Sequence, residues 1–116
     1  MLIELEYKTK QLKKICTDIK KARKKYGEDI ADELHSLINF LISSSNLQEV
    51  NSFQVYHLHG LSGDRDGEYA LDINGRSSGY RLIIVPLDSK LNKENITMFY
   101  ESISIVRIEE VSKHYE

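Results

Sequence analysis

Residues 56–85 read YHLHGLSGDRDGEYALDINGRSSGYRLIIV, and this stretch decides the fold class of the chain. Short runs of alternating apolar and polar residues are separated by glycines. Alternation with a period of two, interrupted by Gly and Asn, is typical of β-strands joined by tight turns. We expect strands near residues 55–60, 68–74 and 79–87. Pro86 is expected at a bulge or a strand edge because it has no N–H to donate.

The ends of the chain add one strand each. Apolar and acidic residues alternate over residues 2–7, which predicts a half-buried strand. A last strand is expected over residues 97–110, where isoleucines alternate with polar side chains. The polar segment 88–95 is expected to be a loop.

Between these strands the apolar period lengthens to that of helices. Thr9 can cap a first helix, and Gly27 can end it. Its apolar stripe consists of Leu12, Ile15, Cys16, Ile19, Ala22 and Tyr26. A second helix is expected from Glu28 to Ile42, with the apolar stripe Ile30, Ala31, Leu34, Leu37, Ile38, Leu41 and Ile42. Two amphipathic helices joined at one glycine predict an antiparallel hairpin or a sharp bend. The order strand, helix, helix, β-meander predicts a single α+β domain over residues 1–116, with the helices on one face of the sheet.

Composition narrows the class of protein further. The chain has 116 residues, of which 41% are hydrophobic and 29% charged, as in globular rather than disordered proteins. No basic start followed by an apolar run is present, so no signal peptide is expected. The one cysteine, Cys16, cannot form an intrachain disulfide and lies in the first apolar stripe, where we expect it to be buried. We therefore expect a cytoplasmic protein without membrane association.

Charge is distributed unevenly, although the net charge is only −2. Residues 8–25 contain nine Lys or Arg and a single acid, Asp18, whereas residues 26–50 contain five acids and no Lys or Arg. Such asymmetry predicts a basic face and an acidic face. Two interpretations of this asymmetry remain open. The two oppositely charged helices can simply attract each other, or the basic face can be a binding surface for a polyanion.

Several kinds of catalytic site are disfavoured by the spacing of residues. The glycines after Gly60 lack the Gly-Lys-Ser/Thr of a phosphate-binding loop, and no helix follows them. His57, His59 and His114 have no suitably spaced carboxylate or cysteine with which to complete a metal site, so neither a metal nor another cofactor is expected. No nucleophile-elbow sequence supports a serine hydrolase.

The three arginines of the meander, Arg65, Arg76 and Arg81, are the only Lys or Arg residues between positions 26 and 89. Each could clamp a phosphate, since the planar guanidinium matches two phosphate oxygens at once. The alternative for Arg81 is an ion pair with a nearby carboxylate, namely Asp64, Asp66 or Asp72. Both interpretations stay open at the level of sequence.

The whole chain resembles the RelE/ParE toxin superfamily, and most closely its HigB branch of host-inhibition toxins. The resemblance lies in the order strand, helix, helix, meander and in four short segments: Leu58-His59-Gly60-Leu61-Ser62-Gly63-Asp64, Glu68-Tyr69, Gly79-Tyr80-Arg81-Leu82 and His114-Tyr115. It implies a small RelE-like microbial RNase fold. It also implies a ribosome-dependent mRNA endonuclease, in which the RNA 2′-hydroxyl attacks the adjacent phosphate without a metal. The implied partners are the ribosome, mRNA and a HigA-like helix-turn-helix antitoxin that neutralises the toxin.

The resemblance also implies roles for individual residues. Arg81 would stabilise the pentavalent phosphate, His114 would act as general acid or base, and Arg76 would assist catalysis. The implied RNA-binding residues are Arg65, Tyr80, Tyr115, Lys113 and Ser62.

This chain departs from the family pattern in three ways. Ser62 stands where the family usually has a lysine, the end reads Lys113-His114-Tyr115 instead of Asp-Tyr-His, and the net charge is acidic. Two alternatives therefore stay open. One is a ParE-like inhibitor of DNA gyrase, which needs no acid–base residue, and the other is a degenerate member that only binds an antitoxin-like partner.

Overall fold

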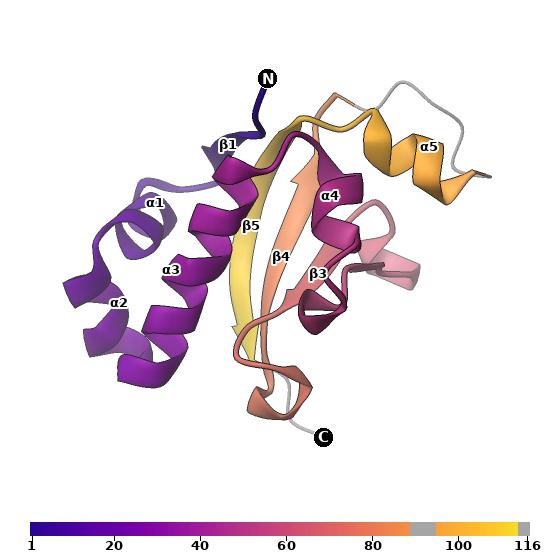
Figure 1. Cartoon of the computed structure of the whole chain (residues 1–116). Helices are drawn as coiled ribbons and strands as arrows, with labels where there is room; N and C mark the ends of the chain where they lie inside the picture. The colour runs from indigo at the N-terminus through magenta and orange to yellow at the C-terminus, as the bar shows by residue number, and fades with distance from the viewer. Residues whose placement is uncertain (89–94, 114–116) are drawn as a thin grey trace.

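The computed structural model describes residues 1–88 and 95–113, and over these residues the chain forms one five-stranded sheet with helices packed against it (Figure 1). The spatial order of the strands is β1-β5-β4-β3-β2. Their bounds are β1 Glu4–Tyr7, β2 His59–Gly60, β3 Tyr69–Asp72, β4 Tyr80–Pro86 and β5 Ile105–Lys113. The predicted α+β class is confirmed.

The last four strands form the predicted antiparallel meander, and β1 joins it in parallel at the free edge of β5. In the register of the sheet, Asp72 lies opposite Arg81, and Leu82 lies opposite Val111. The register shifts between Ile83 and Ile84, so Glu109 is an extra residue in β5. Such a bulge bends the strand and increases its twist.

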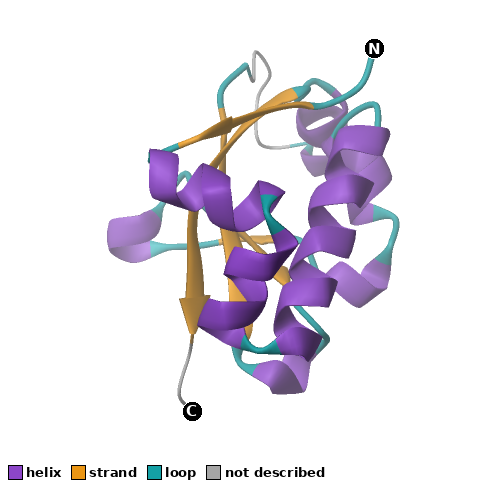
Figure 2. Ribbon diagram, turned by 90° about the vertical axis from the view of Figure 1, so that its left-hand side faces the viewer, coloured by secondary structure: helices purple, strands orange, loops and turns teal. Residues whose placement is uncertain are grey.

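The helices are α1 Lys10–Thr17, α2 Ile19–Tyr26, α3 Glu28–Ser43, α4 Leu47–Asn51 and α5 Ile96–Glu101. Short 3-10 turns occupy Gln54–Tyr56 (η1), Gly63–Arg65 (η2) and Arg76–Ser78 (η3). Figure 2 shows the helices gathered in front of the strands and to one side of them. Within the described ranges, no helix is long and apolar enough to cross a membrane.

The core lies between the helices and one face of the sheet. Alternate strand residues such as Leu71, Leu82 and Ile108 are fully buried there against the stripe of α3, which includes Leu34 and Leu37. Fully burying one such side chain contributes about 1.5–3 kcal/mol. The residues between them in the strands, including Asp72 and Arg81, therefore belong to the opposite face of the sheet.

The single first helix predicted from the stripe Leu12 to Tyr26 is wrong, because the chain breaks it at Asp18. Asp18 has extended backbone angles (φ −122°, ψ 103°), and its carboxylate accepts hydrogen bonds from the N–H groups of Lys20 (3.1 Å) and Lys21 (3.4 Å). The residue thus ends α1 and caps α2. The hairpin itself is confirmed, since α2 and α3 run side by side from Gly27, and Arg23 of α2 pairs with Asp32 of α3 at 2.9 Å (Figure 1).

Two predicted strands also need correction. Residues 54–56 form η1, and only His59–Gly60 of the predicted strand 55–60 pairs in the sheet. Residues 96–101 form α5, because Asn95 caps a helix by accepting a hydrogen bond from the N–H of Met98 at 3.1 Å. The last strand begins only at Ile105. Of the predicted loop over 88–95, residues 89–94 lie outside the described part of the chain.

Candidate functional site

The end of the sheet near the β3–β4 turn carries a group of four interacting side chains, which we name the His57 cluster: His57, Asp72, Arg76 and Arg81. Asp72 ends β3, and Arg81 lies directly opposite it in β4. Arg76 belongs to η3 in the turn between these strands, and His57 lies just before β2. The hairpin therefore brings together residues up to 24 positions apart in the chain.

The carboxylate of Asp72 is the buried centre of this cluster, with only 2% of its side chain exposed. Its Oδ1 lies 3.0 Å from Nε of Arg81. Among the described residues, however, that oxygen accepts no well-aligned hydrogen bond. The ion-pair interpretation of Arg81 is confirmed, with Asp72 as the partner.

The guanidinium of Arg81 also holds the turn in place. Nη1 donates to the carbonyl of Tyr80 at 2.8 Å, and Nη2 donates to the carbonyl of Arg76 at 2.9 Å. The Arg81 side chain is 15% exposed. Arg81 thus fixes the backbone from which the exposed side chain of Arg76 extends.

His57 has an unusual backbone conformation for a residue other than glycine, with φ 47° and ψ 55°. Its Nδ1 lies 3.8 Å from Oδ2 of Asp72, and its Nε2 lies 3.3 Å from Nη2 of Arg76. Because a guanidinium only donates, this contact places the lone pair of Nε2 toward Arg76 and the proton of a neutral ring on Nδ1, toward Asp72. The imidazole is therefore held between a carboxylate and a guanidinium.

His59 packs against this imidazole. The two rings are stacked with centroids 4.4 Å apart, and Nδ1 of His59 donates to the backbone carbonyl of His57 at 2.8 Å. Among the described residues, no group of three or more metal-ligating side chains is present. An imidazole beside a carboxylate and a guanidinium can transfer a proton or bind an anion.

A cavity of about 260 Å³ opens beside the cluster. It is lined by Asn51, Gln54, His57, Leu58 and Arg76. The amides of Asn51 and Gln54 both donate and accept hydrogen bonds, so the cavity offers polar groups next to an imidazole and a cation. A phosphate ester with an attached polar group has the complementary chemistry.

Tyr80 and Lys113 meet at the same end of the sheet, on the face toward the helices. They are cross-strand partners, and Nζ of Lys113 lies 5.2 Å from the centre of the Tyr80 ring. Tyr26 of α2 meets the Tyr80 ring edge-on at 5.7 Å. His114 and Tyr115, which the resemblance implies in catalysis and RNA binding, lie outside the described residues, directly after Lys113.

Arg65 and Ser62 lie in the loop between β2 and β3, away from the His57 cluster. Arg65 pairs with Glu68 at 2.7 Å and with Glu110. Hydrogen bonds to Glu110 and Glu68 raise the pKa of Arg65 above its ordinary value. Since Glu110 is opposite Ile83, Arg65 reaches the middle of the sheet face that also carries Arg81. Ser62 is exposed and precedes η2.

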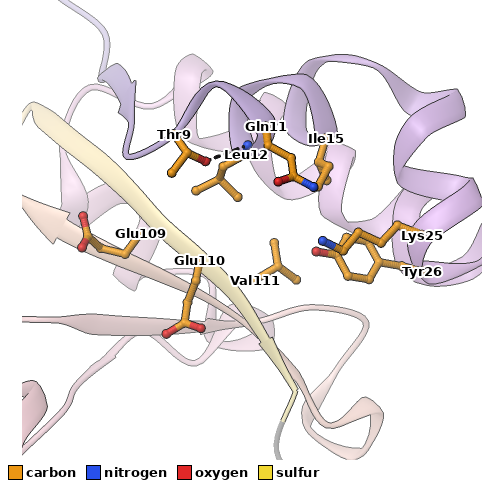
Figure 3. A pocket seen from close by; sticks show the side chains of 9 residues that line it. All are labelled: Thr9, Gln11, Leu12, Ile15, Lys25, Tyr26, Glu109, Glu110 and Val111. Carbon is orange, nitrogen blue, oxygen red and sulfur yellow. Dashed lines mark hydrogen bonds between the residues drawn. The ribbon is translucent and has the colours of Figure 1, made fainter.

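A second cavity, of about 190 Å³, lies between β5 and the two basic helices (Figure 3). Figure 3 shows Lys25 and Tyr26 on one side of it and Glu109, Glu110 and Val111 on the other. Thr9 caps α1 at its rim by accepting a hydrogen bond from the N–H of Leu12 at 3.0 Å. This cavity has apolar walls and charges of both signs, so its chemistry points to no single ligand.

The structure therefore brings some of the predicted site residues together and separates others. Arg76 and Arg81 share one cluster, and Tyr80 and Lys113 adjoin it, whereas Arg65 and Ser62 do not contribute to it. Sequence reasoning did not assign His57 and Asp72 to the site. The available signal was their position at the two ends of a predicted hairpin, with Asp72 four residues before Arg76.

Comparison with solved structures identifies the fold. The structure resembles the crystal structure of YafQ from E. coli strain BL21(DE3), with a TM-score of 0.58 and 20% sequence identity over 97% of this chain and 93% of that chain. It also resembles a histidine-to-glutamine variant of YafQ from E. coli, with a TM-score of 0.53 at the same identity and coverage. No protein-family model matches the chain, and no curated protein matches its sequence. The RelE-like fold expected from the sequence resemblance is confirmed.

Proposed function

We propose that this chain is a HigB-like toxin of a type II toxin–antitoxin module, which cleaves mRNA on the ribosome and is neutralised by a HigA-like helix-turn-helix antitoxin. The sequence resemblance to the RelE/ParE superfamily and the fold shared with YafQ support this proposal. Its site of action would be the cytoplasm, where ribosomes translate mRNA.

The observation that carries the proposal is the grouping of Arg76 and Arg81 at one end of the sheet, next to an imidazole and an open cavity. Fixed cations aimed at a phosphate stabilise the charge that develops during phosphoryl transfer, and loss of one such donor typically costs about 2.7–4 kcal/mol. Arg76 is the exposed guanidinium of the group and would bind the phosphate directly. Arg81 retains N–H donors on both terminal nitrogens beside its bonds to carbonyl groups, so it would support the same phosphate.

The basic helices provide a second contact to nucleic acid in this proposal. All nine Lys and Arg residues between positions 8 and 25 are exposed, and all except Lys8 belong to α1 or α2. Contacts between such side chains and RNA phosphates release counterions, so this contribution weakens as salt rises. Tyr80, and also Tyr115, would stack on bases, as aromatic side chains on RNA-binding sheets do.

The proposal is tested by inducible expression in bacteria with mapping of new RNA 5′ ends. The wild type is expected to arrest growth and to create new ends inside translated regions, and the variants Arg76→Ala and His114→Ala are expected to abolish both. Arg107→Ala is a matched control, because Arg107 lies opposite Val85, far along β4 from the cluster. Arrest with intact mRNA would contradict the nuclease and indicate a gyrase inhibitor of the ParE type.

A second candidate function is supported by a specific observation. Arg65 and Arg81 are both engaged by carboxylates, and Ser62 replaces the usual lysine of this turn. A degenerate member that only binds an antitoxin-like partner would tolerate these features. It predicts a folded protein that neither arrests growth nor creates new RNA ends.

A further inference from the structure

We propose that His57 is the proton acceptor of the active site, that Asp72 positions its imidazole, and that Arg76 covers its reactive nitrogen until a phosphate binds. This inference rests on the proposed RNA cleavage and names the base for that reaction.

The backbone at His57 presents the imidazole to the cavity. A left-handed conformation is uncommon outside glycine and is kept only where surrounding contacts hold it. Here the ring is fixed by stacking on His59 (4.4 Å) and by its position beside Asp72 and Arg76. The side chain nevertheless remains 42% exposed, so a substrate can reach it.

Asp72 has the surroundings expected of a positioning carboxylate. It is buried, its Oδ1 lacks an aligned hydrogen bond among the described residues, and its Oδ2 faces Nδ1 of His57 at 3.8 Å. A carboxylate at this place holds the proton on Nδ1 and leaves the lone pair on Nε2. It also stabilises the imidazolium that forms when Nε2 accepts a proton, as in other carboxylate–imidazole pairs.

Arg76 occupies the position that the substrate would need. Its Nη2 lies 3.3 Å from Nε2 of His57, and its side chain is otherwise exposed. A guanidinium binds a phosphate more strongly than it binds a neutral imidazole, because the bond to phosphate is charge-assisted and bidentate. An arriving phosphodiester would therefore draw Arg76 away from Nε2 and place the phosphorus next to an unblocked base.

The resulting step conserves atoms and charge. The 2′ oxygen of the RNA forms a bond to phosphorus while its proton moves to Nε2 of His57, and the bond from phosphorus to the 5′ oxygen breaks. The departing 5′ oxygen takes a proton from water. The hydroxide that remains then removes the proton from Nε2 of the His57 imidazolium. The products are a 2′,3′-cyclic phosphate and a 5′-hydroxyl end.

His59 is less suited to this role than His57. Its Nδ1 is bonded to the carbonyl of His57, and its cross-strand partner is Ala70. It is not among the residues that line the cavity beside Arg76. We therefore assign it the part of a support for the His57 ring.

The test uses His57→Gly, because glycine adopts a positive φ without strain and the exposed site leaves room for free imidazole. In a purified translation system with a reporter mRNA, this variant is expected to cleave roughly 100-fold or more slowly than the wild type. Added imidazole is expected to restore much of the loss. Asn74→Gly is the matched control, since Asn74 also has a positive φ (59°), and it should cleave like the wild type with or without imidazole.

Asp72→Asn tests the positioning role separately. It should slow cleavage by itself, measured per folded protein. In the Asp72→Asn/His57→Gly double variant the added loss relative to His57→Gly should be smaller than the loss from Asp72→Asn alone, because the imidazole that Asp72 positions is already gone and only the support for Arg81 is still removed. If the fold losses in cleavage rate of the two single variants simply multiply in the double variant, the positioning role of Asp72 is wrong. Wild-type rates in His57→Gly, or a loss that imidazole does not restore, would overturn the assignment of His57 while leaving the nuclease intact. Absence of cleavage by the wild type would overturn the proposed function and the inference together.

Discussion

The pair Arg81–Asp72 is the residue-level feature with the clearest energetic consequence. Both side chains are largely buried, at 15% and 2% exposed. Removing one member of a buried pair leaves an uncompensated charge and typically costs about 3–5 kcal/mol. We expect Arg81→Met to lower the free energy of unfolding by about 3 kcal/mol, as measured by urea denaturation.

The double variant Arg81→Met/Asp72→Asn is the informative control for this pair. It leaves neither charge unpaired, so its loss should be smaller than the sum of the two single losses by about 0.5–3 kcal/mol. Strict additivity would show that the pair does not couple. A toxicity test that relied on Arg81→Ala alone would confuse unfolding with loss of chemistry, which is why Arg76 is the better first target.

For single residues, the sequence indicated which residue types could form the site better than it indicated which residues they contact. The arginines of the meander were recognised, and Asp72 was among the three carboxylates considered for Arg81. The ladder register then selected Asp72 by placing it directly opposite Arg81. His57 was not recognised as a site residue, because its role depends on a left-handed backbone and on a turn 19 residues away, at Arg76. Neither is encoded in a local pattern.

Among the elements, the break between α1 and α2 depends on one side chain. Asp18 accepts hydrogen bonds from two N–H groups at the start of α2 and places a negative charge at the positive end of that helix. We expect Asp18→Ala to lower the free energy of unfolding by about 1 kcal/mol in urea denaturation. Asp18→Asn should lose less, since asparagine also caps, and a full loss in both variants would contradict capping as the cause.

The connection from α5 to β5 depends on Asp88. Burial alone would raise the pKa of its carboxyl, but hydrogen bonds from the N–H groups of Ile105 and Ser104 and from the Ser104 hydroxyl bring the pKa below its ordinary value. A depressed folded-state pKa contributes stability above the unfolded value, near 3.9, and that contribution is lost as pH falls through the folded value.

We therefore expect Asp88→Asn to have a lower melting temperature than the wild type at pH 7, and the difference to shrink toward pH 3. Melting curves monitored by circular dichroism at the two pH values measure this. Asp29→Asn is a suitable control, because Asp29 is exposed in the first turn of α3. A difference that stays constant from pH 7 to pH 3 would show that the carboxylate charge is not the cause.

Elements were predictable where one periodicity extends over many residues, as in α3 and β4. They were not predictable where a single polar residue overrides the pattern. The apolar stripe continues through Ile15, Cys16 and Ile19, and it conceals the break at Asp18. Residues 96–101 are rich in β-branched and aromatic side chains, yet the cap at Asn95 and burial of Phe99 and Tyr100 in the core make them helical. Tertiary packing thus outweighed local propensity there.

For the molecule as a whole, the layer arrangement followed from the sequence because each element has one apolar side. The apolar stripe of each helix and the apolar face of the sheet can be buried only by packing against each other. The place of β1 was not predictable, because the alternation over residues 2–7 does not indicate whether it pairs with β5 or another edge. The parallel pairing of Glu4 with Ile105 joins the two ends of the described chain. The core therefore depends on contacts between distant segments.

The reactivity of the Cys16 thiol can be used to measure how the core unfolds. The predicted burial is confirmed, with 2% of the residue exposed, and burial raises the pKa of the thiol to about 12. Only a thiolate reacts with disulfide reagents, so the native protein should be almost inert at pH 8. Because Cys16 packs in the core between α1 and its neighbours, its labelling should require global unfolding rather than local opening.

We expect the rate of labelling by a coloured aromatic disulfide to rise with urea with the same slope as the free energy of global unfolding. The double variant Cys16→Ala/Glu101→Cys, whose thiol is at an exposed position, should react at once without urea and independently of its concentration. Rapid labelling of Cys16 in the native protein, or a slope much shallower than that of unfolding, would show that α1 opens separately from the sheet. In that case the basic face formed by α1 and α2 would be a mobile element, and the contacts with RNA proposed for it would carry an additional ordering cost.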